Sequence, residues 1–311
     1  MTRRIVRRLI GIVAVVAIAI SATFVLVIAL PADPARILVG PHATPATLAR
    51  VRAHYCLDRG VVTKYGCFVG RIARGDLGTS LRSRRPVASI IADRAAATAQ
   101  LALAALALQL ALAVPLAVAA ARWRGRWSGS AIEVAITIAQ STPAFVLGPL
   151  LLYLVGFQLG WLPLSGQGSG TADRLRHLVL PAATLALTGM ATQIRVLREE
   201  LIGSLASDHV RAARARGLSE RAVVWRHGLV PALGPFVTVV GLDLGALLGG
   251  AIVVESVFAW PGLGRETMQA VADLDIPVIL GITLVAAIAV CVANLAADLV
   301  AAWLDPRATE P

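Results

Sequence analysis

Long apolar runs alternate with shorter polar stretches along this chain. The first run covers about residues 9–30 and follows a cluster of arginines near the amino terminus. Runs of similar length follow at about residues 98–121, 131–159, 178–197, 230–258 and 277–304. An α-helix needs roughly 20 apolar residues to cross the hydrocarbon core of a bilayer, and each run is long enough to do so. The pattern therefore predicts an all-α integral membrane protein with six transmembrane helices.

The polar stretches predict how these helices are oriented. Arginine gathers in short stretches at 122–127 and 198–230, and short basic loops stay in the cytoplasm. The segment at 31–96 is too long for that rule to apply, so we expect it outside the membrane, with short helices between its prolines. Both termini are then cytoplasmic. The predicted organisation is a first helix with its cytoplasmic end at 1–30, an extracytoplasmic segment at 31–96, a five-helix core at 97–304 and a cytoplasmic tail at 305–311.

Composition agrees with a membrane protein. Only 15% of the residues are charged, whereas soluble domains carry about 25%. The net charge of +11 could indicate nucleic-acid binding. The arginines flank the apolar runs instead of forming one patch, however, and membrane orientation explains that distribution better. We therefore expect a lipid bilayer around the chain and no nucleic-acid partner.

The chain lacks the residue patterns of several enzyme classes. A phosphate-binding loop requires Lys followed by Ser or Thr, and the only lysine, Lys64, precedes Tyr65. The five histidines show no metal-ligand spacing, and no Gly-x-Ser-x-Gly elbow occurs. We therefore predict a non-catalytic protein with no metal site and no cofactor of its own.

Two of the three cysteines, Cys56 and Cys67, lie in the predicted extracytoplasmic segment. A disulfide persists in that compartment, and their spacing permits a small closed loop. The sequence leaves open whether they are bonded or form two free thiols. Cys291 lies inside an apolar run, where we expect a buried small side chain.

The polar stretch from Asp208 to Glu220 predicts a short basic helix in the cytoplasm. Gly217 is expected to end it, because glycine readily adopts the left-handed conformation found at helix C-termini. A second helical piece at about 220–226 precedes Pro231. Such a helix–glycine–helix element could dock into a groove of a partner protein or contact anionic lipid headgroups. The residues alone do not separate these two hypotheses.

This stretch resembles the EAA loop of ABC importer permeases, with Ala212, Ala213 and Gly217 at the spacing of that motif. This chain departs from the motif at two positions: Arg211 replaces its Glu, and its Pro is displaced by one residue, at Pro231. The peptide-importer branch of the family shows the same departures. In that family the loop forms a coupling helix that sits in a cleft of a separate ATPase subunit. The resemblance therefore implies a set of coupling residues, namely Arg211, Ala212, Ala213, Arg214, Arg216, Gly217 and Leu218.

Further motifs extend the resemblance over nearly the whole chain. They lie at 30–34, 75–80, 85–91, 141–145, 160–163, 250–258, 260–264 and 304–307. Together and in order, they resemble the dipeptide, oligopeptide and nickel permease family. The resemblance implies a type I ABC importer fold and a role in peptide import across the bacterial inner membrane. The partners it implies are a second homologous permease subunit, two cytoplasmic ATPase subunits that use ATP and Mg, and an extracytoplasmic peptide-binding protein.

One acidic residue, Asp243, lies inside the fifth apolar run. Ionisable groups at membrane depth usually face the bundle interior or a water-filled cavity. We hypothesise that Asp243 lines the translocation path and attracts a substrate amino group. The alternative is a structural acid held by hydrogen bonds.

Other polar and small residues in the apolar runs suggest wall and packing positions. Gln140, Ser141 and Thr142 precede Pro143 and could form a polar patch on the pathway wall or part of a kink. The fifth apolar run also carries a stripe of glycines spaced four residues apart, Gly241, Gly245 and Gly249. Such a stripe would let helix backbones approach closely, either within this chain or against another subunit.

Three alternatives to peptide import remain open at this level. Within the family, the substrate could be nickel or another small solute. A secondary transporter that works without ATP would require inverted repeats and buried ion-coupling acids, neither of which is clear in this sequence. A membrane scaffold or sensor would transport nothing. Association with a pair of ATPase subunits separates the first interpretation from the last two.

Overall fold

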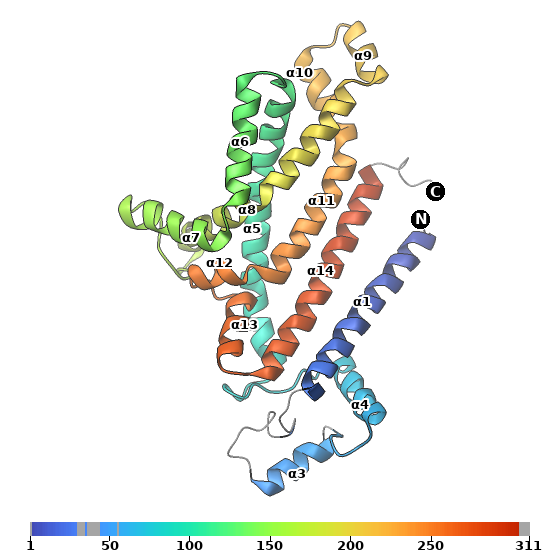
Figure 1. Cartoon of the computed structure of the whole chain (residues 1–311), viewed down its shortest axis with the longest axis vertical. Coiled ribbons are helices and arrows are strands. Elements are labelled where there is room, and N and C mark those ends of the chain that lie inside the picture. Colours follow the sequence, from blue (N-terminus) through green and yellow to red (C-terminus); the bar gives the residue numbers. More distant parts are fainter. Residues whose placement is uncertain (1, 30–34, 36–43, 55, 305–311) are drawn as a thin grey trace. The chain divides into compact units, whose positions relative to one another are not determined.

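A computed structural model describes residues 2–29, 35, 44–54 and 56–304 of the chain. The regular elements within these ranges are helices, which confirms the predicted all-α class (Figure 1). An isolated bridge also pairs Thr79 with Pro86. The helices are α1 (Thr2–Ala29), α3 (Pro45–His54), α4 (Val61–Ala73), α5 (Val87–Arg122), α6 (Trp127–Ser141), α7 (Ala144–Leu151), η1 (Leu152–Gln158), α8 (Thr171–Leu205), α9 (Asp208–Ala215), α10 (Glu220–Ala222), η2 (Val223–Gly228), α11 (Leu229–Gly250), α12 (Ile252–Val257), α13 (Leu263–Ala272) and α14 (Ile276–Leu304).

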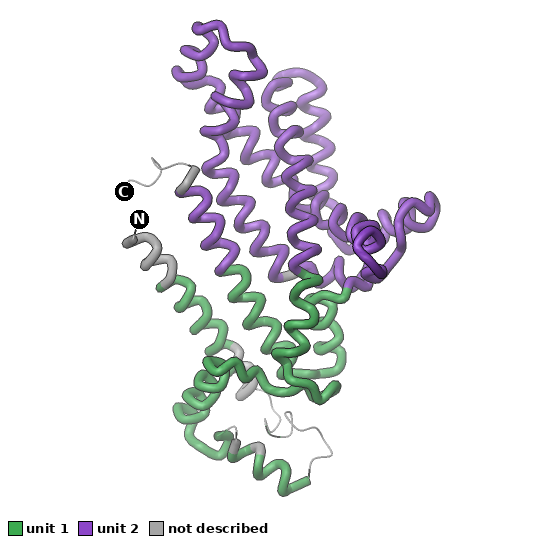
Figure 2. Tube along the Cα trace, turned by 180° about the vertical axis from the view of Figure 1, so that it is seen from behind, with its two compact units in different colours: residues 1–98, 261–291 green, residues 99–260, 292–311 purple. Residues whose placement is uncertain are grey.

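The chain divides into two compact units, which Figure 2 colours separately. Unit 1 comprises residues 1–98 and 261–291. Unit 2 comprises residues 99–260 and 292–311. The long helices α5 and α14 each contribute residues to both units, so neither unit is formed by one continuous piece of chain.

Four helical stretches are long and apolar enough to cross a membrane, and a bent pair could supply a fifth. α1 is predicted to be a further span, and the described part of it includes the apolar stretch Ile10–Ala22. The count of six transmembrane helices therefore stays a prediction. The four stretches are Val87–Arg122, Thr171–Leu205, Glu220–Gly249 and Ile276–Ala302.

The third predicted span, which Pro143 interrupts in the sequence, is sharply bent. The structure divides it into α6 and the α7–η1 pair, whose axes differ in direction by 101° (Figure 1). The break falls at Thr142 and Pro143, which both have extended backbones with ψ of 114° and 145°. Proline disfavours the helical conformation of the residue before it and lacks an N–H to continue the ladder. The proline noted in the sequence therefore ends the helix instead of only kinking it.

The boundaries of other predicted spans also change. α11 ends at Gly250, so the fifth run does not continue as one helix to residue 258. Consecutive glycines at that end have low helix propensity, and the short helix α12 follows them. α5 begins at Val87, well before the predicted start at 98, because a helix can continue through polar residues that an apolar pattern does not include.

The core of unit 2 is built on α8. Ala191, Ile194, Leu197 and Leu201 of this helix are buried, as is Phe236 of α11. From α5 the core receives alanines spaced four residues apart, at Ala113, Ala117 and Ala121. Side chains this small let helix backbones approach closely, which is the packing that membrane helices favour.

The core of unit 1 joins the start of α5 to α13 and the start of α14. Val87, Ile91, Leu263 and Ile282 are buried together there. Gly281 permits this contact, because a Cβ atom at that position would lie 2.5 Å from Cγ1 of Val87. The core of unit 1 is therefore packed so closely that an added methyl group at position 281 would not fit without a shift of its neighbours.

Gly241 of α11 gives a test of the packing in unit 2. A Cβ atom at Gly241 would lie 1.8 Å from Cβ of Ala297 on α14. We expect Gly241→Ala to lower the free energy of unfolding by about 1–3 kcal/mol through overpacking. The measurement is the melting temperature of the purified protein in detergent.

The matched control is Gly203→Ala, because Gly203 is an exposed helical glycine and a Cβ atom added there would meet no atom within 4 Å. Its substitution should raise stability by up to about 1 kcal/mol, because alanine has the higher helix propensity. Equal melting temperatures for the two variants would show that the contact between Gly241 and Ala297 is not tight.

Candidate functional site

The predicted cytoplasmic stretch folds as a helix–glycine–helix element. α9 ends in two backbone hydrogen bonds, in which the N–H of Gly217 donates to the carbonyl of Arg214 (2.9 Å) and the N–H of Leu218 donates to that of Ala213 (3.4 Å). This pair is the Schellman arrangement, which requires a left-handed residue after the helix. Gly217 supplies it with φ of 77°. Ser219 then caps the next helix by accepting from the N–H of Ala222 at 3.4 Å.

One face of α9 is buried against the rest of the loop. Val210 and Ala213 pack with Val223 of η2 in a small apolar cluster. Of the predicted coupling residues, Ala213 is therefore the one that faces inward. The other six are exposed and lie on the free surface of the element: Arg211, Ala212, Arg214, Arg216, Gly217 and Leu218.

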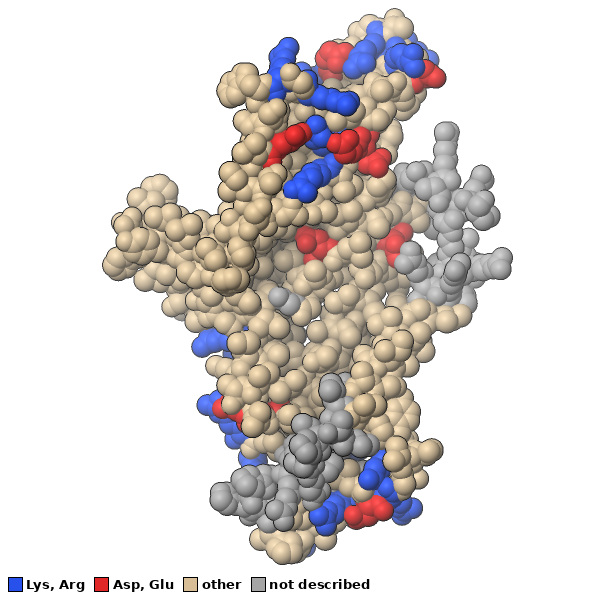
Figure 3. All heavy atoms as spheres, viewed as in Figure 1, with Lys and Arg blue, Asp and Glu red and all other residues tan. Residues whose placement is uncertain are grey.

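Ion pairs tie the exposed face of α9 to its neighbours. Nε of Arg214 lies 2.8 Å from Oε1 of Glu220, which links α9 to α10. Arg211 pairs within α9 with Asp208 at 2.7 Å. These pairs are solvent-exposed and contribute about 0–1 kcal/mol each. Figure 3 shows charged side chains gathered over the end of unit 2 that α9 and α10 form. The element therefore presents a polar surface with Leu218 exposed in it.

A polar network joins three helices inside unit 2. Nε2 of Gln193 on α8 donates to Oδ2 of Asp243 on α11 (3.0 Å) and to Oε1 of Gln109 on α5 (3.2 Å). Nε2 of Gln109 in turn donates to the carbonyl of Leu185 at 3.4 Å. Both glutamines are fully buried, whereas Asp243 is only partly buried. The network therefore holds one carboxylate oxygen of Asp243 from the core side.

Gly189 makes room for this network on α8. A Cβ atom there would lie 2.2 Å from Nε2 of Gln109 and 3.4 Å from both carboxylate oxygens of Asp243. The amide of Gln109 and the carboxylate of Asp243 therefore both lie in the space that a side chain at position 189 would occupy. Ionisable groups at membrane depth are costly unless they are paired or hydrated, and the hydrogen bond from Gln193 supplies one partner for Asp243.

The other predicted pathway residues have partners of a different kind. Ser141 and Thr142 donate to carbonyls of their own helix, those of Thr137 (2.8 Å) and Ile138 (2.9 Å). Gln140 accepts a hydrogen bond from Arg195 of α8. The structure therefore groups Gln140 with α8 and does not bring these three residues into the network around Asp243.

The three glycines of the stripe on α11 differ in how exposed they are. Gly241 and Gly245 are buried, and the contact of Gly241 is with Ala297 of the same chain. Gly249 is exposed. Packing within the chain therefore accounts for Gly241.

In unit 1, a disulfide joins Cys56 to Cys67, which is one of the two states that the sequence left open. α4, which contains Cys67, also contacts α1. The hydroxyl groups of Tyr65 and Ser21 lie 2.8 Å apart, and the ring centroids of Tyr65 and Phe24 lie 5.1 Å apart. The predicted extracytoplasmic segment is thus attached to the first predicted span.

Sequence reasoning missed the two glutamines of the network. The available signal was a lone amide in an apolar stretch, as at Gln109 between alanines and leucines. Glu255, which the sequence suggests near the outer interface and in reach of the outer loop, is fully buried in α12. Among the described residues, no group of three or more His, Cys, Asp or Glu side chains could hold a metal ion.

The contact between Gly189 and Gln109 can be tested by a double-mutant cycle. We expect Gly189→Ala to lower the free energy of unfolding by about 1–3 kcal/mol, because its methyl group displaces the amide of Gln109. In a Gln109→Ala background the same substitution should cost much less, since the clashing atom is gone. The measurement is thermal unfolding of the four proteins in detergent. Additive effects would contradict the geometry of the network.

The fold matches solved structures of a methionine ABC transporter. A chain of the MetNI methionine ABC transporter, in an inward facing conformation, aligns with a TM-score of 0.56 and 18% sequence identity over 70% of this chain and 96% of that chain. A second crystal form gives a TM-score of 0.59 at 16% identity over the same shares. At these identities the comparison shows the fold alone.

Sequence comparisons show the family. The glutathione transport system permease proteins GsiC of Escherichia coli (strain K12) and of Salmonella typhi are each 37% identical to this chain over 306 residues, which cover 98% of both sequences. The family described as "Binding-protein-dependent transport system inner membrane component" matches residues 113–310. Its N-terminal counterpart matches residues 1–102. The chain therefore belongs to the binding-protein-dependent inner membrane components and is a permease subunit of an ABC importer.

Proposed function

We propose that this chain forms half of the translocation pathway of an ATP-driven peptide importer. Family membership removes the grounds for a secondary transporter or a scaffold. The substrate class is supported by the relatives at 37% identity, whose name states glutathione transport. Glutathione is a short peptide with a free amino group. No observation in the described part of the chain favours nickel, because no metal-binding group of side chains is found there.

The proposed assembly follows from what this chain does not supply. Its sequence has no phosphate-binding loop, so ATP and Mg belong to two cytoplasmic ATPase subunits. The chain itself is non-catalytic and needs no cofactor. A second homologous permease subunit completes the pathway, and an extracytoplasmic binding protein delivers the peptide. We place the complex in the bacterial inner membrane, with both termini of this chain in the cytoplasm.

The observation that carries this proposal is the exposed helix–glycine–helix element. Six of the seven predicted coupling residues are on its surface, so a cleft in an ATPase subunit could receive it. The buried side of α9 is fixed by Val210 and Val223, and Arg214 links α9 to α10. A displacement of α9 would therefore move η2, and with it α11, which continues directly from η2.

Motion of α11 would reach the polar network, because Asp243 lies on that helix and is hydrogen-bonded to Gln193 on α8. The nucleotide state of the ATPase subunits would then bias the pathway toward its inward-open or outward-open form, as a ligand shifts a two-state equilibrium. In this scheme the carboxylate of Asp243 attracts the amino group of the peptide. Gln193 holds that carboxylate in position through its hydrogen bond.

The coupling role predicts that Gly217→Pro abolishes the stimulation of ATP hydrolysis by peptide and binding protein. Proline requires φ near −65°, whereas Gly217 has φ of 77° and donates its N–H to Arg214. The measurement is ATPase activity of the complete complex in nanodiscs, with and without peptide-loaded binding protein. We expect activity to remain at the unstimulated level.

Gly125→Pro is the matched control. Gly125 has the same φ of 77°, a Cβ atom added there would meet no atom within 4 Å, and it lies in the other predicted cytoplasmic loop. Retained stimulation in this control shows that the loss is specific to the coupling element. If Gly217→Pro assembles and is stimulated normally, the coupling assignment is wrong.

The pathway role predicts that Asp243→Asn reduces the uptake of peptides with a free amino group by roughly 10- to 100-fold, which corresponds to the loss of one charge-assisted hydrogen bond. Asparagine keeps the shape of the side chain, so assembly should be preserved. The measurement is uptake of radiolabelled peptide into proteoliposomes. An N-acetylated peptide should be taken up at the same rate by the variant and the wild type. Unchanged uptake of the free peptide would leave Asp243 as a structural acid.

A further inference from the structure

Arg195 is an exposed arginine on α8, inside the fourth predicted span. Within the described part of the chain, its guanidinium group has one partner, the side-chain carbonyl of Gln140 on α6, and that partner carries no charge. Arginine is costly at membrane depth, where ionisable residues usually face the bundle interior or a water-filled cavity and mark the path of a substrate. Its charge therefore requires an explanation that Gln140 does not provide.

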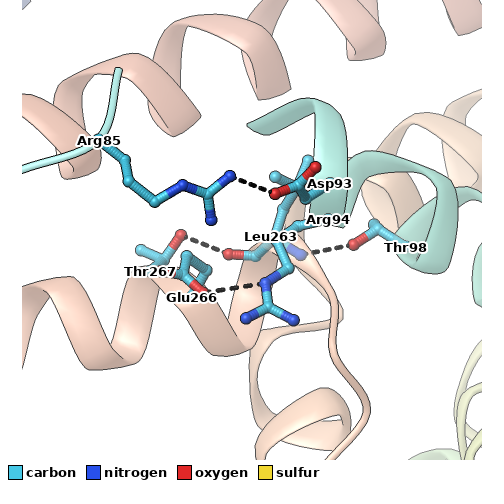
Figure 4. Close-up of polar contacts among 7 residues, drawn as sticks. All are labelled: Arg85, Asp93, Arg94, Thr98, Leu263, Glu266 and Thr267. Carbon is cyan, nitrogen blue, oxygen red and sulfur yellow. Dashed lines mark hydrogen bonds and ion pairs between the residues drawn. The ribbon is translucent and has the colours of Figure 1, made fainter. Parts of the chain in front are cut away.

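Arginines in unit 1 show the more usual pairing. Arg85 lies 2.6 Å from a carboxylate oxygen of Asp93, and Arg94 lies 3.2 Å from one of Glu266 (Figure 4). In each pair the charge of the guanidinium group is balanced by a carboxylate of the same chain. Arg195 differs from both because its acceptor is an amide.

The carboxylates closest to Arg195 on α6 and α8 are bound by another arginine. Arg198 lies 2.6 Å from Oε1 of Glu133 and also pairs with Glu199. Neither of these two acids forms an ion pair with Arg195 in the described structure. The guanidinium group of Arg195 therefore keeps donors that can bind an anion from outside the chain.

Arg195 and Asp243 lie at opposite edges of one exposed face of α8. Asp243 of α11 marks the first edge, since both of its carboxylate oxygens would lie 3.4 Å from a Cβ atom at Gly189. Gly189, Thr192 and Arg195 follow at three-residue spacing, and each such step moves about 60° around a helix. Thr192 is exposed, so this row crosses the open side of α8 and ends at Arg195, beside Gln140 of α6.

The separation of the two charges suits a short peptide. Arg195 comes six residues after Gly189 on α8, which is a rise of about 9 Å along the helix. Long side chains on a helix lean toward its N-terminus, and this brings the guanidinium group of Arg195 toward the level of Asp243. An extended chain of two or three residues spans about 7–10 Å, so a peptide of that length can reach both groups.

We infer that Arg195 binds the C-terminal carboxylate of the transported peptide while Asp243 holds its amino group. The inference rests on the proposed function and adds the second charged end of the substrate to it. A guanidinium group presents two parallel donors, which match a carboxylate in bidentate geometry. Gln140 holds that guanidinium group in position without neutralising it. The pathway then selects short peptides in which both ends are free.

The test is uptake of radiolabelled alanyl-alanine into proteoliposomes that contain the complete complex and its binding protein. Arg195→Gln should reduce uptake roughly 10- to 100-fold, because one charge-assisted contact is lost. Arg195→Lys keeps the positive charge and should restore part of the uptake. Arg85→Gln is the matched control, since Arg85 is an exposed arginine already paired with Asp93. It should leave uptake within about twofold of the wild-type rate.

Gln140→Glu separates carboxylate binding from a structural link between α6 and α8. The new carboxylate keeps this link and neutralises Arg195, so the melting temperature should be retained while uptake falls as in Arg195→Gln. The C-terminal amide of the dipeptide, at a concentration that saturates the binding protein, should be taken up at the same rate by the wild type and both variants. Wild-type uptake of the free dipeptide by Gln140→Glu would overturn the inference, and so would equal losses for the free dipeptide and its amide; both results leave the proposed importer intact. If the wild-type complex takes up no peptide, the proposed function fails as well.

Discussion

The interior of a bilayer offers no water to an unpaired peptide group, and this constraint governs every apolar run of the chain. Backbone donors and acceptors must be satisfied within each segment, so the apolar runs have to be helices. Breaks in these helices therefore occur at residues that disfavour the helical conformation, namely proline and glycine. Pro143 separates α6 from α7, and the glycines at the end of α11 precede α12. Irregular backbone at such points is tolerated where protein or water can satisfy it.

The same constraint explains how polar side chains are treated inside unit 2. Gln109, Gln193 and Asp243 come from three helices and hydrogen-bond to one another, because an isolated polar group there would be costly. Their meeting requires a glycine at position 189, where any side chain would occupy the space of an amide. A polar network at membrane depth thus depends on the absence of a side chain. The alanine-rich core around α8 depends on small residues in the same way.

Outside the apolar stretches, exposed charge and local hydrogen bonds take the place of extensive packing. α9 is closed by its Schellman bonds and held by a three-residue apolar cluster, and Arg214 links it to Glu220. Unit 1 follows a similar rule in its own loops, where Asp275 is buried and accepts from the hydroxyl of Ser80 at 2.5 Å. Both regions combine a fixed inner face with a polar outer face. Surfaces of this kind suit reversible contact with partner proteins.

The sequence by itself determined the helical class, the membrane location of the apolar runs, the left-handed end of α9 at Gly217 and the family. These features depend on local composition and on motifs, that is, on residues that lie close together in the sequence. Tertiary structure decided which polar residues meet. Gln109 and Asp243 lie far apart in the chain, and no periodic pattern connects them. It also decided that the third run bends sharply at Pro143, that Ala213 faces inward, and that Arg195 meets Gln140. The physical reason is that packing between distant helices, unlike helix formation, is not encoded in neighbouring residues.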